Sequence, residues 1–234
     1  MINSTQILIR LSSSFLTYTE DLIAQYRQLD MGAHRDIIRF YEANKQTLPH
    51  LDIDEFIEIE LGYTNALFEV GRYESFLITV QYLLEALIYH NIQYVNGEDA
   101  YENLLFRKAA AHYQLLELNS AARVLWEILR INPDNQAAAY LLKRCLVKSE
   151  PLFLRTAKAI SIFLFLLSAL VIGLELLIIR PFFDQYAHGV EIARIGIFLF
   201  ALVLLIAADG LHRLRSFHHV NKEMERFRKR KLLP

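Results

Sequence analysis

The 234-residue sequence is poor in residues that cross-link or interrupt a chain. Its single cysteine, Cys145, excludes an intrachain disulfide framework and fits a reducing compartment. Only Pro49, Pro133 and Pro151 precede the first long apolar run, and no alternating strand pattern of useful length occurs. These scarcities exclude a disulfide-stapled scaffold and favour an all-α fold.

The sequence also lacks the short motifs that identify common active sites. It has no phosphate-binding glycine loop, dinucleotide motif, HExxH, GxSxG or paired-cysteine motif. His212 and His219 are two helical turns apart, too far for a compact metal site within one helix. The acidic run from Asp52 to Glu60 suits a helix start, where the helix dipole favours carboxylates. We therefore expect no enzyme activity, no cofactor and no metal.

The N-terminal twenty residues lack the features of a secretory signal. They have no positive start, and Arg10 and the serines at 12–14 interrupt every apolar stretch. We expect residues 1–150 to stay in the cytoplasm.

What the sequence does have is a long apolar run, Ala159 to Ile179, in which Glu175 is the only charged residue. As a helix these 21 residues span about 31 Å, close to the hydrocarbon thickness of a bilayer. Only a helix or a closed barrel satisfies its own backbone in lipid. The run predicts a transmembrane helix.

A second apolar run has an uncharged core, Ile195 to Ala208, of only 14 residues. Alone it is too short to span a bilayer and is compatible with a buried soluble helix. Extended back to Val190 it reaches about 28 Å, with Glu191 and Arg194 at one end. The short connection between the runs favours an antiparallel two-helix hairpin, with interfacial aromatics at Phe182 and Tyr186.

Two pairs of opposite charges should match in depth within this hairpin. With the turn near residue 184, Glu175 lies level with Arg194, and Asp209 lies close to Lys158. Pairing is expected because an isolated charge at the bilayer centre costs about 3 kcal/mol on insertion scales. The alternative for Glu175 is a place on an ion or proton path.

Small residues offer the two helices a close contact. Ala169 and Gly173 form a small-xxx-small face on the first helix, with Gly196 available on the second.

Charge is distributed unevenly along the chain. Residues 1–150 carry 13 Lys and Arg against 20 Asp and Glu, and residues 151–234 carry 12 against 6. The acidic first part argues against nucleic acid as a partner. Basic residues gather before the first run and after the second, so we expect both termini in the cytoplasm, in a bacterial inner membrane. The candidate lipid-facing basic tail is Arg226, Arg228, Lys229, Arg230 and Lys231.

Apolar spacing of three to four residues predicts helices throughout the first 150 residues. The expected helices include 73–94 and 99–118, separated by the turn signal Asn96-Gly97, followed by shorter ones near 120–131 and 134–148.

The segment from Tyr101 to Asn135 resembles a tetratricopeptide repeat. Ala109 and Ala121 stand at its small helix-contact positions, and Pro133 lies at the end of the unit. The segment around Gly71 resembles the same unit, and 18–51 does so more weakly. The units begin about 39 and 45 residues apart, against the family's 34. The resemblance implies stacked helix pairs and a protein-binding surface.

The sequence thus predicts an all-α protein in three parts: a cytoplasmic tetratricopeptide-like domain (1–150), a transmembrane hairpin (151–210) and a basic amphipathic tail (211–234). The expected function is a membrane-anchored adaptor or structural subunit that binds partner proteins, as a homo- or hetero-oligomer. The alternative is a component of an oligomeric transporter or channel that uses the hairpin.

Overall fold

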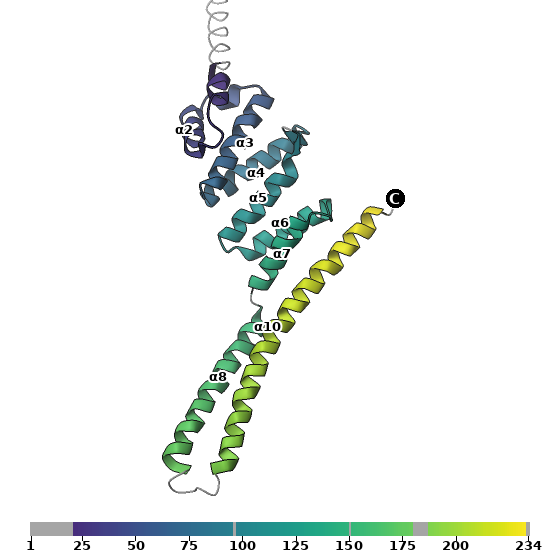
Figure 1. Cartoon of the computed structure of the whole chain (residues 1–234). Helices are drawn as coiled ribbons and strands as arrows, with labels where there is room; N and C mark the ends of the chain where they lie inside the picture. The colour runs from purple at the N-terminus through teal and green to yellow at the C-terminus, as the bar shows by residue number, and fades with distance from the viewer. Residues whose placement is uncertain (1–20, 96, 150, 180–186, 233–234) are drawn as a thin grey trace, which may run out of the picture. The chain divides into compact units, whose positions relative to one another are not determined.

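The computed structural model describes residues 21–95, 97–149, 151–179 and 187–232 (Figure 1). Contacts divide the chain into two units, Met1–Ile128 and Leu129–Pro234, which are described separately. The described residues are mostly helical and contain one short two-stranded ribbon, so the all-α prediction is confirmed. Residues 1–20 and the aromatics of the 180–186 connection lie outside the described residues.

The first unit is a succession of short helices. Residues 21–27 are helical. The elements that follow are α2 (His34–Asn44), η1 (Leu48–His50), α3 (Ile53–Glu69), α4 (Tyr73–Tyr89), β1 (Tyr94–Val95), β2 (Glu98–Asp99), α5 (Ala100–Gln114) and α6 (Leu118–Ile131), the last of which ends in the second unit.

Two helices of this unit end earlier than the sequence predicts, because residues with positive φ end them. Asn91 has φ 53°, and α4 ends at Tyr89 instead of residue 94. Leu116 has φ 61°, and α5 ends at Gln114 instead of residue 118. Left-handed backbone cannot continue a right-handed helix. Helix periodicity alone did not reveal either stop.

The segment between α4 and α5 is an antiparallel ribbon in which Tyr94 pairs with Asp99. Gly97, with φ 82°, supplies the tight turn that the Asn96-Gly97 signal predicts. Asp99 also caps α5, because its side chain accepts a hydrogen bond from the Glu102 N–H at 2.9 Å. The ribbon therefore fixes where α5 begins.

The helices of the first unit pack in sequence order: α2 against α3, α3 against α4, and α4 against α5. Their core is mainly aliphatic and also holds two large buried aromatic side chains, Phe76 and Tyr26. Ala109 and Ala121, expected at close helix contacts, are also fully buried. Burial agrees with a close approach there, and the tetratricopeptide arrangement itself stays a prediction.

The second unit contains the end of α6 and three longer elements. These are α7 (Gln136–Lys148), α8 (Leu152–Leu174) continued by the π-helical turn η2 (Glu175–Ile179), and α10 (Ala187–Leu232). The α8 and α10 helices lie side by side and antiparallel (Figure 1). Ring contacts mark their register: Phe165 with Phe198 at 5.3 Å, and Phe153 with His212 at 5.9 Å.

The last helix is continuous where the sequence suggested a boundary at 210–211. Its 46 residues extend over about 69 Å, and Gly210 lies inside it without a break. One packed face runs its full length: its first half meets α8 and its second half meets α7. Lys143 of α7, for example, lies over the Phe217 ring at 5.7 Å. Packing therefore groups α7 with the two long helices.

Candidate functional site

The side chains of α8 and η2 that are buried in the contact with α10 are mostly small or polar. Leu154, Ser161, Ser168 and Glu175 are the buried residues of α8 and η2, and they recur every seven positions. The seven-residue repeat keeps one seam facing a neighbouring helix. On α10, Ala201 is fully buried, and the Phe165–Phe198 contact places it close to the level of Ser161.

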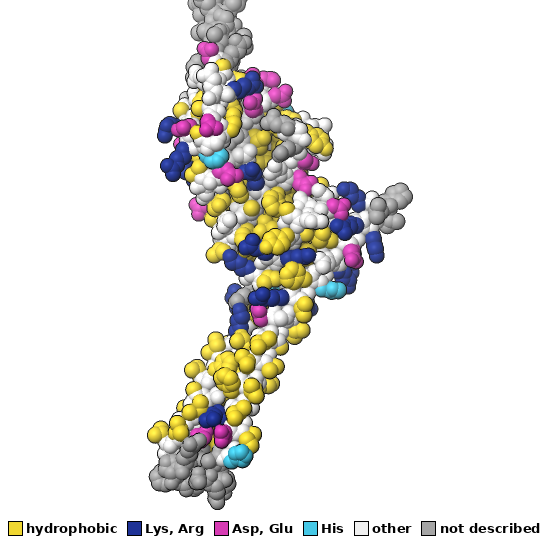
Figure 2. Space-filling view, in the orientation of Figure 1, with side chains coloured by type: hydrophobic (Ala, Val, Ile, Leu, Met, Phe, Trp, Pro, Cys, Tyr) yellow, Lys and Arg dark blue, Asp and Glu magenta, His cyan; other side chains and the backbone are white. Residues whose placement is uncertain are grey.

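Most of the large apolar side chains of the same helices are exposed. Figure 2 shows a continuous apolar surface over this part of the helix pair. A soluble helix pair buries its large apolar residues and exposes polar ones, so this distribution is the reverse of the soluble pattern. The exposed members include Ile162, Phe163, Leu166, Leu170 and Leu177 on α8 and η2, and Phe198, Phe200, Val203 and Ile206 on α10.

Both helices are long and apolar enough to cross a membrane. The qualifying segments are Leu152–Ile178, with 17% of its most apolar window buried, and His188–Lys231, with 6% buried. The core helix of a soluble protein would be mostly buried, which these segments are not.

Glu175 and Arg194, expected at equal depth, form an ion pair. Arg194 Nη1 donates to Glu175 Oε2 at 2.9 Å, and the Glu175 side chain is 1% exposed against 24% for Arg194. A buried carboxylate needs such a partner, because removing it from water costs several kcal/mol. That the pair lies inside a bilayer stays a prediction.

Glu175 occupies an unusual backbone position. It is the first residue of the π-helical turn η2, which continues α8 to Ile179. A π-turn adds a residue per turn and shifts the side chains that follow, and such turns occur often at functional sites. The turn places Leu176, Leu177 and Ile178 outward while Glu175 faces α10.

The structure corrects the small-residue face. Ala169 and Gly196 are exposed, and nothing lies within 4 Å of a Cβ built on Gly173 or Gly196. The buried small residues are Ser161 and Ser168. The sequence could have shown this, because Ser161 and Ser168 lie fourteen and seven positions before Glu175. A charged residue in an apolar helix faces its partner, and residues at this spacing share its face.

His212 and His219, the histidines considered above as metal ligands, belong to no metal-binding group in the described residues. The described residues contain no group of three or more His, Cys, Asp or Glu side chains that could hold a metal. Asp209 pairs with Arg213 at 2.9 Å, one turn along α10. His212 is 7% exposed, and its Nε2 has no hydrogen-bond partner in the described part of the chain.

The candidate lipid-facing tail makes several contacts inside the second unit. Arg228 pairs with Asp134 at 2.8 Å, and Lys231 Nζ reaches the Ile131 carbonyl at 3.4 Å. Arg226 pairs with Glu223 on its own helix. Among the apolar residues of this part of α10, Val220 is fully buried, whereas Leu214 and Phe217 are exposed.

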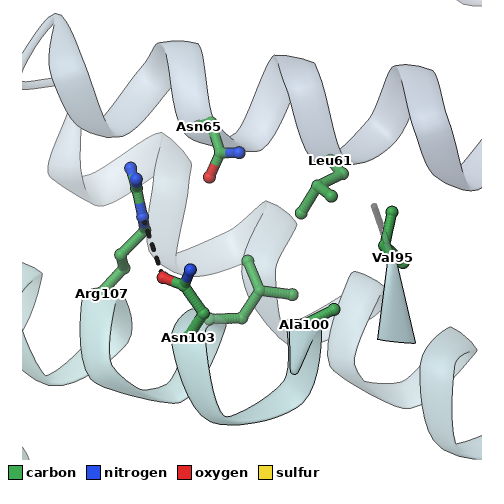
Figure 3. Close-up of a pocket in the computed structure, with 7 residues that line it drawn as sticks. Leu61, Asn65, Val95, Ala100, Asn103 and Arg107 are labelled. Atoms are coloured by element: carbon green, nitrogen blue, oxygen red, sulfur yellow. Dashed lines mark hydrogen bonds between the residues drawn. The ribbon is translucent and has the colours of Figure 1, made fainter. Parts of the chain in front are cut away.

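The first unit has a cavity of about 300 Å³ between α3 and α5 (Figure 3). Asn65 points into it from α3, opposite Asn103 and Arg107 of α5, and Leu61, Val95 and Ala100 form its apolar end. The two amides offer donors and acceptors, and the guanidinium offers donors only.

Arg107 is held in place by three neighbours. It donates to Glu69 Oε1 at 3.1 Å and to Asn103 Oδ1 at 3.4 Å, and it lies 5.3 Å from the Phe68 ring centroid. These contacts restrain the guanidinium at the polar end of the cavity, so a ligand group would meet an ordered cation.

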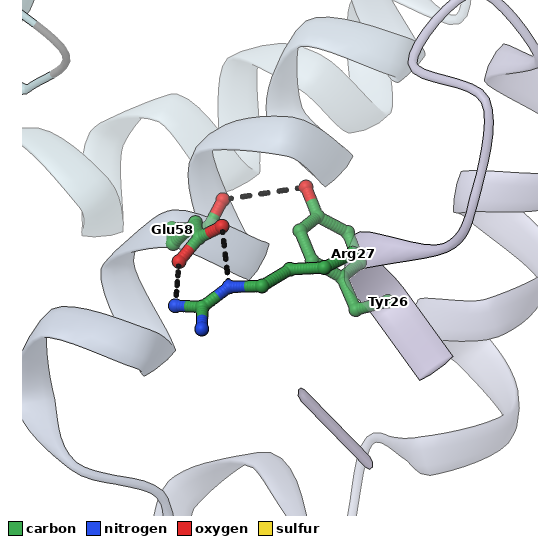
Figure 4. A network of polar contacts seen from close by, with 3 residues as sticks. All are labelled: Tyr26, Arg27 and Glu58. Carbon is green, nitrogen blue, oxygen red and sulfur yellow. Dashed lines mark hydrogen bonds and ion pairs between the residues drawn. The ribbon is translucent and has the colours of Figure 1, made fainter. Parts of the chain in front are cut away.

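A second polar network ties the start of the described chain to α3 (Figure 4). Arg27 pairs with Glu58 at 2.8 Å, and the Tyr26 hydroxyl donates to the Glu58 carbonyl at 3.4 Å. Burial and the nearby Glu58 charge raise the pKa of Tyr26 to about 12. The buried Tyr26 ring holds this segment against α3.

A buried carboxylate, Glu60, lies between α2 and α3. The Tyr41 hydroxyl donates to it at 2.7 Å, and the Tyr41 and Tyr63 rings stack with centroids 3.7 Å apart. Burial raises the pKa of Glu60, although the Tyr41 hydrogen bond and the Lys45 charge oppose that shift. The acidic run therefore divides: Asp54 and Glu55 lie in the first turn of α3, as expected, while Glu58 and Glu60 serve helix contacts.

Comparison with family models, curated proteins and solved structures finds no match for this chain.

Proposed function

We propose that this protein is a membrane-anchored adaptor or structural subunit that binds partner proteins through its first unit. In this proposal α8 and α10 cross a bacterial inner membrane as a hairpin with both termini in the cytoplasm. The observation that carries the proposal is the reversed surface of the helix pair, whose small and polar residues are buried and whose large apolar residues are exposed.

A lipid environment accounts for the exposed large apolar residues and the buried small ones, whereas an aqueous environment does not. Between helices in lipid there is no hydrophobic driving force, so close packing of small residues and hydrogen bonds hold them together. Exposed Phe163 and Phe200 would face acyl chains, while Ser161 and Ser168 allow the backbones to approach. In water the same pair would expose a large apolar surface prone to aggregation.

The protein-binding part of the proposal rests on the cavity between α3 and α5. Asn65 and Asn103 can pair with the N–H and C=O groups of an extended peptide, and Arg107 suits a carbonyl or carboxylate. The resemblance of residues 101–135 to a tetratricopeptide repeat supports the same function. The partner proposed here is therefore a peptide segment of another protein.

Co-purification of the full chain from its own membranes tests this function. The native protein should retain a defined partner, which mass spectrometry identifies, and Asn65→Ala with Asn103→Ala should lose it. Gln81→Ala with Glu85→Ala is the matched control, because these residues pair on the exposed side of α4. A partner retained equally by both variants would refute binding at the cavity.

A second candidate, a subunit of an oligomeric transporter or channel, is favoured by Glu175. A buried carboxylate on a π-turn, paired with Arg194, could release its partner and take up a proton or cation. Glu175→Gln that leaves the pair stable but abolishes ion flux in proteoliposomes would favour this candidate. A defined homo-oligomeric ring after mild detergent extraction would point the same way.

A further inference from the structure

The basic residues of the second unit include two groups at different levels of α10, with Lys143, Arg144 and Lys222 between them. We define the basic collar as Lys148 of α7, Arg155 and Lys158 of α8, and Arg213 and Arg215 of α10. The basic tail is Arg226, Arg228, Lys229, Arg230 and Lys231. The sequence pointed to the tail as the lipid-facing group, and the packing of α10 separates the roles of the two.

Contacts between the helices place the collar residues at nearly the same level. Phe153 meets His212, which puts Arg155 near residue 210 and Lys158 near residue 207 of α10. Lys143 meets Phe217, and Arg228 meets Asp134, so α7 is antiparallel to α10 and its Lys148 lies near residue 213. The five residues therefore occupy about 12 Å along the α10 axis.

This level is the end of the apolar surface. Exposed aliphatic and aromatic side chains lie among the basic residues of the collar. The same mixture occurs where a membrane protein passes from the hydrocarbon core to the headgroups. All the collar residues are exposed except Lys158, which is half-buried. The exposed apolar residues at this level are Leu152, Phe153, Leu211, Leu214 and Phe217.

The collar carries a strong excess of positive charge. Asp209 is the acidic residue at this level in the described chain, and it is already paired with Arg213. Glu150, also near this level in the sequence, lies outside the described residues. Figure 2 shows basic side chains close to where the apolar surface ends.

The tail lies farther along the same straight element. Its residues follow Arg215 by 11 to 16 positions, or about 16 to 24 Å of helix. That distance exceeds the Debye length of about 8 Å at physiological salt. Arg228 and Lys231 also contact Asp134 and the Ile131 carbonyl, so they hold α10 against the start of α7.

We propose that the basic collar binds the phosphate groups of anionic phospholipids, and that the tail instead fastens α10 to its own unit. This inference rests on the proposed insertion of α8 and α10 in a membrane. Lys and Arg on three helices surround one end of the apolar pair, so anionic headgroups gather there, while the lipid on the opposite side meets no such excess.

Spin-labelled lipids test the proposal with the full chain reconstituted in phosphatidylcholine bilayers. Electron spin resonance gives the fraction of labelled phosphatidylglycerol, or of labelled phosphatidylcholine, that the protein immobilises. The native protein should prefer phosphatidylglycerol several-fold, since one basic residue near the surface supplies up to about fivefold. In 1 M salt, the ratio of immobilised phosphatidylglycerol to immobilised phosphatidylcholine should fall toward one.

The collar variant carries Lys148→Gln, Arg155→Gln and Arg215→Gln. The matched control carries Lys222→Gln, Lys229→Gln and Arg230→Gln, which removes equal charge and keeps the Arg228 and Lys231 contacts. The collar variant should lose the preference, and the control should keep it. Arg215→Gln alone should lower it, and this exposed residue has no polar partner in the described chain, so folding is not at risk.

Four results would overturn the proposal. A collar variant with native preference, or a control that loses as much, refutes the collar as the lipid site. Immobilised lipid with equal preference for both headgroups in the native protein refutes the collar and leaves insertion standing. No immobilised lipid of either kind refutes insertion itself, and the collar with it.

Discussion

Arg194 donates a 2.9 Å hydrogen bond to Glu175, and this contact joins the first π-helical turn after α8 to the second turn of α10. The carboxylate is buried and the guanidinium remains partly exposed. The pair fixes the register of the two helices, because shifting either by one residue would leave the carboxylate without its partner.

Glu175→Gln and Arg194→Gln should each destabilise the helix pair, and the double variant should be less harmful than their sum. Polar pairs between membrane helices are worth about 0.6 kcal/mol on average, and up to nearly 2. A double-mutant cycle on the unfolding of the reconstituted protein measures this coupling. If the two losses of stability added exactly in the double variant, the two side chains would not interact in the reconstituted protein.

The buried face of α8 that includes Ser168 predicts different effects on stability for substitutions at two neighbouring residues. Ser168→Leu should overpack the contact with α10 and destabilise the pair by about 1 to 3 kcal/mol, because Ser168 is 3% exposed. Ala169→Leu adds a larger group at an exposed position and should be nearly neutral. The yield of a disulfide engineered between the two helices reports on both. If Ala169→Leu destabilised the pair and Ser168→Leu did not, Ala169 rather than Ser168 would face α10.

Gly62 is required where Tyr26 crosses α3. A Cβ on Gly62 would lie 1.8 Å from the Tyr26 hydroxyl oxygen, so Gly62→Ala should lower the stability of the first unit by about 1 to 3 kcal/mol. Tyr26→Phe removes that oxygen and should relieve part of the cost in the double variant. Gly32→Ala, whose Cβ meets Asp30 at an ordinary 3.4 Å, is the control in thermal melting.

Glu60 makes the stability of the first unit depend on pH. Its pKa is raised in the folded state, so the folded state holds the proton more tightly than the unfolded one. The resulting stability is present below the unfolded pKa and is lost as pH rises through the folded pKa. Glu60→Gln mimics the protonated form and should be more stable than native at pH 8, with the difference vanishing near pH 4. Denaturant-induced unfolding that gave the same dependence of stability on pH for the native protein and for Glu60→Gln would contradict this prediction.

The proposed topology places Tyr186 on the side opposite Leu232. Cysteines introduced singly at these positions should label with an impermeant maleimide from opposite sides of sealed vesicles. The native Cys145 should stay silent, because it is fully buried and burial raises the pKa of its thiol to about 11. Labelling of both positions from the same side would refute the two-span hairpin.

The sequence was sufficient where a local property decides the structure. The apolar run of α8, the helical spacing before residue 150, and the turns at Gly71 and Gly97 each depend on a few adjacent residues. The equal level of Glu175 and Arg194 also followed from counting residues on either side of one turn, because an antiparallel pair makes depth a matter of arithmetic.

Tertiary packing decided the rest. Whether Ala169 or Ser168 faces α10 depends on the rotation of α8, which the buried Glu175 sets. The left-handed stop at Leu116 reflects the packing of the helices it joins, since leucine does not favour that backbone, whereas the asparagine at position 91 is a residue type that adopts it more readily. The continuity of α10 past residue 210 depends on α7, whose distant side chains cover the second half of its face. Composition along one segment determines that it is an apolar or charged helix, but only the neighbours it meets determine which face is buried and which stays exposed.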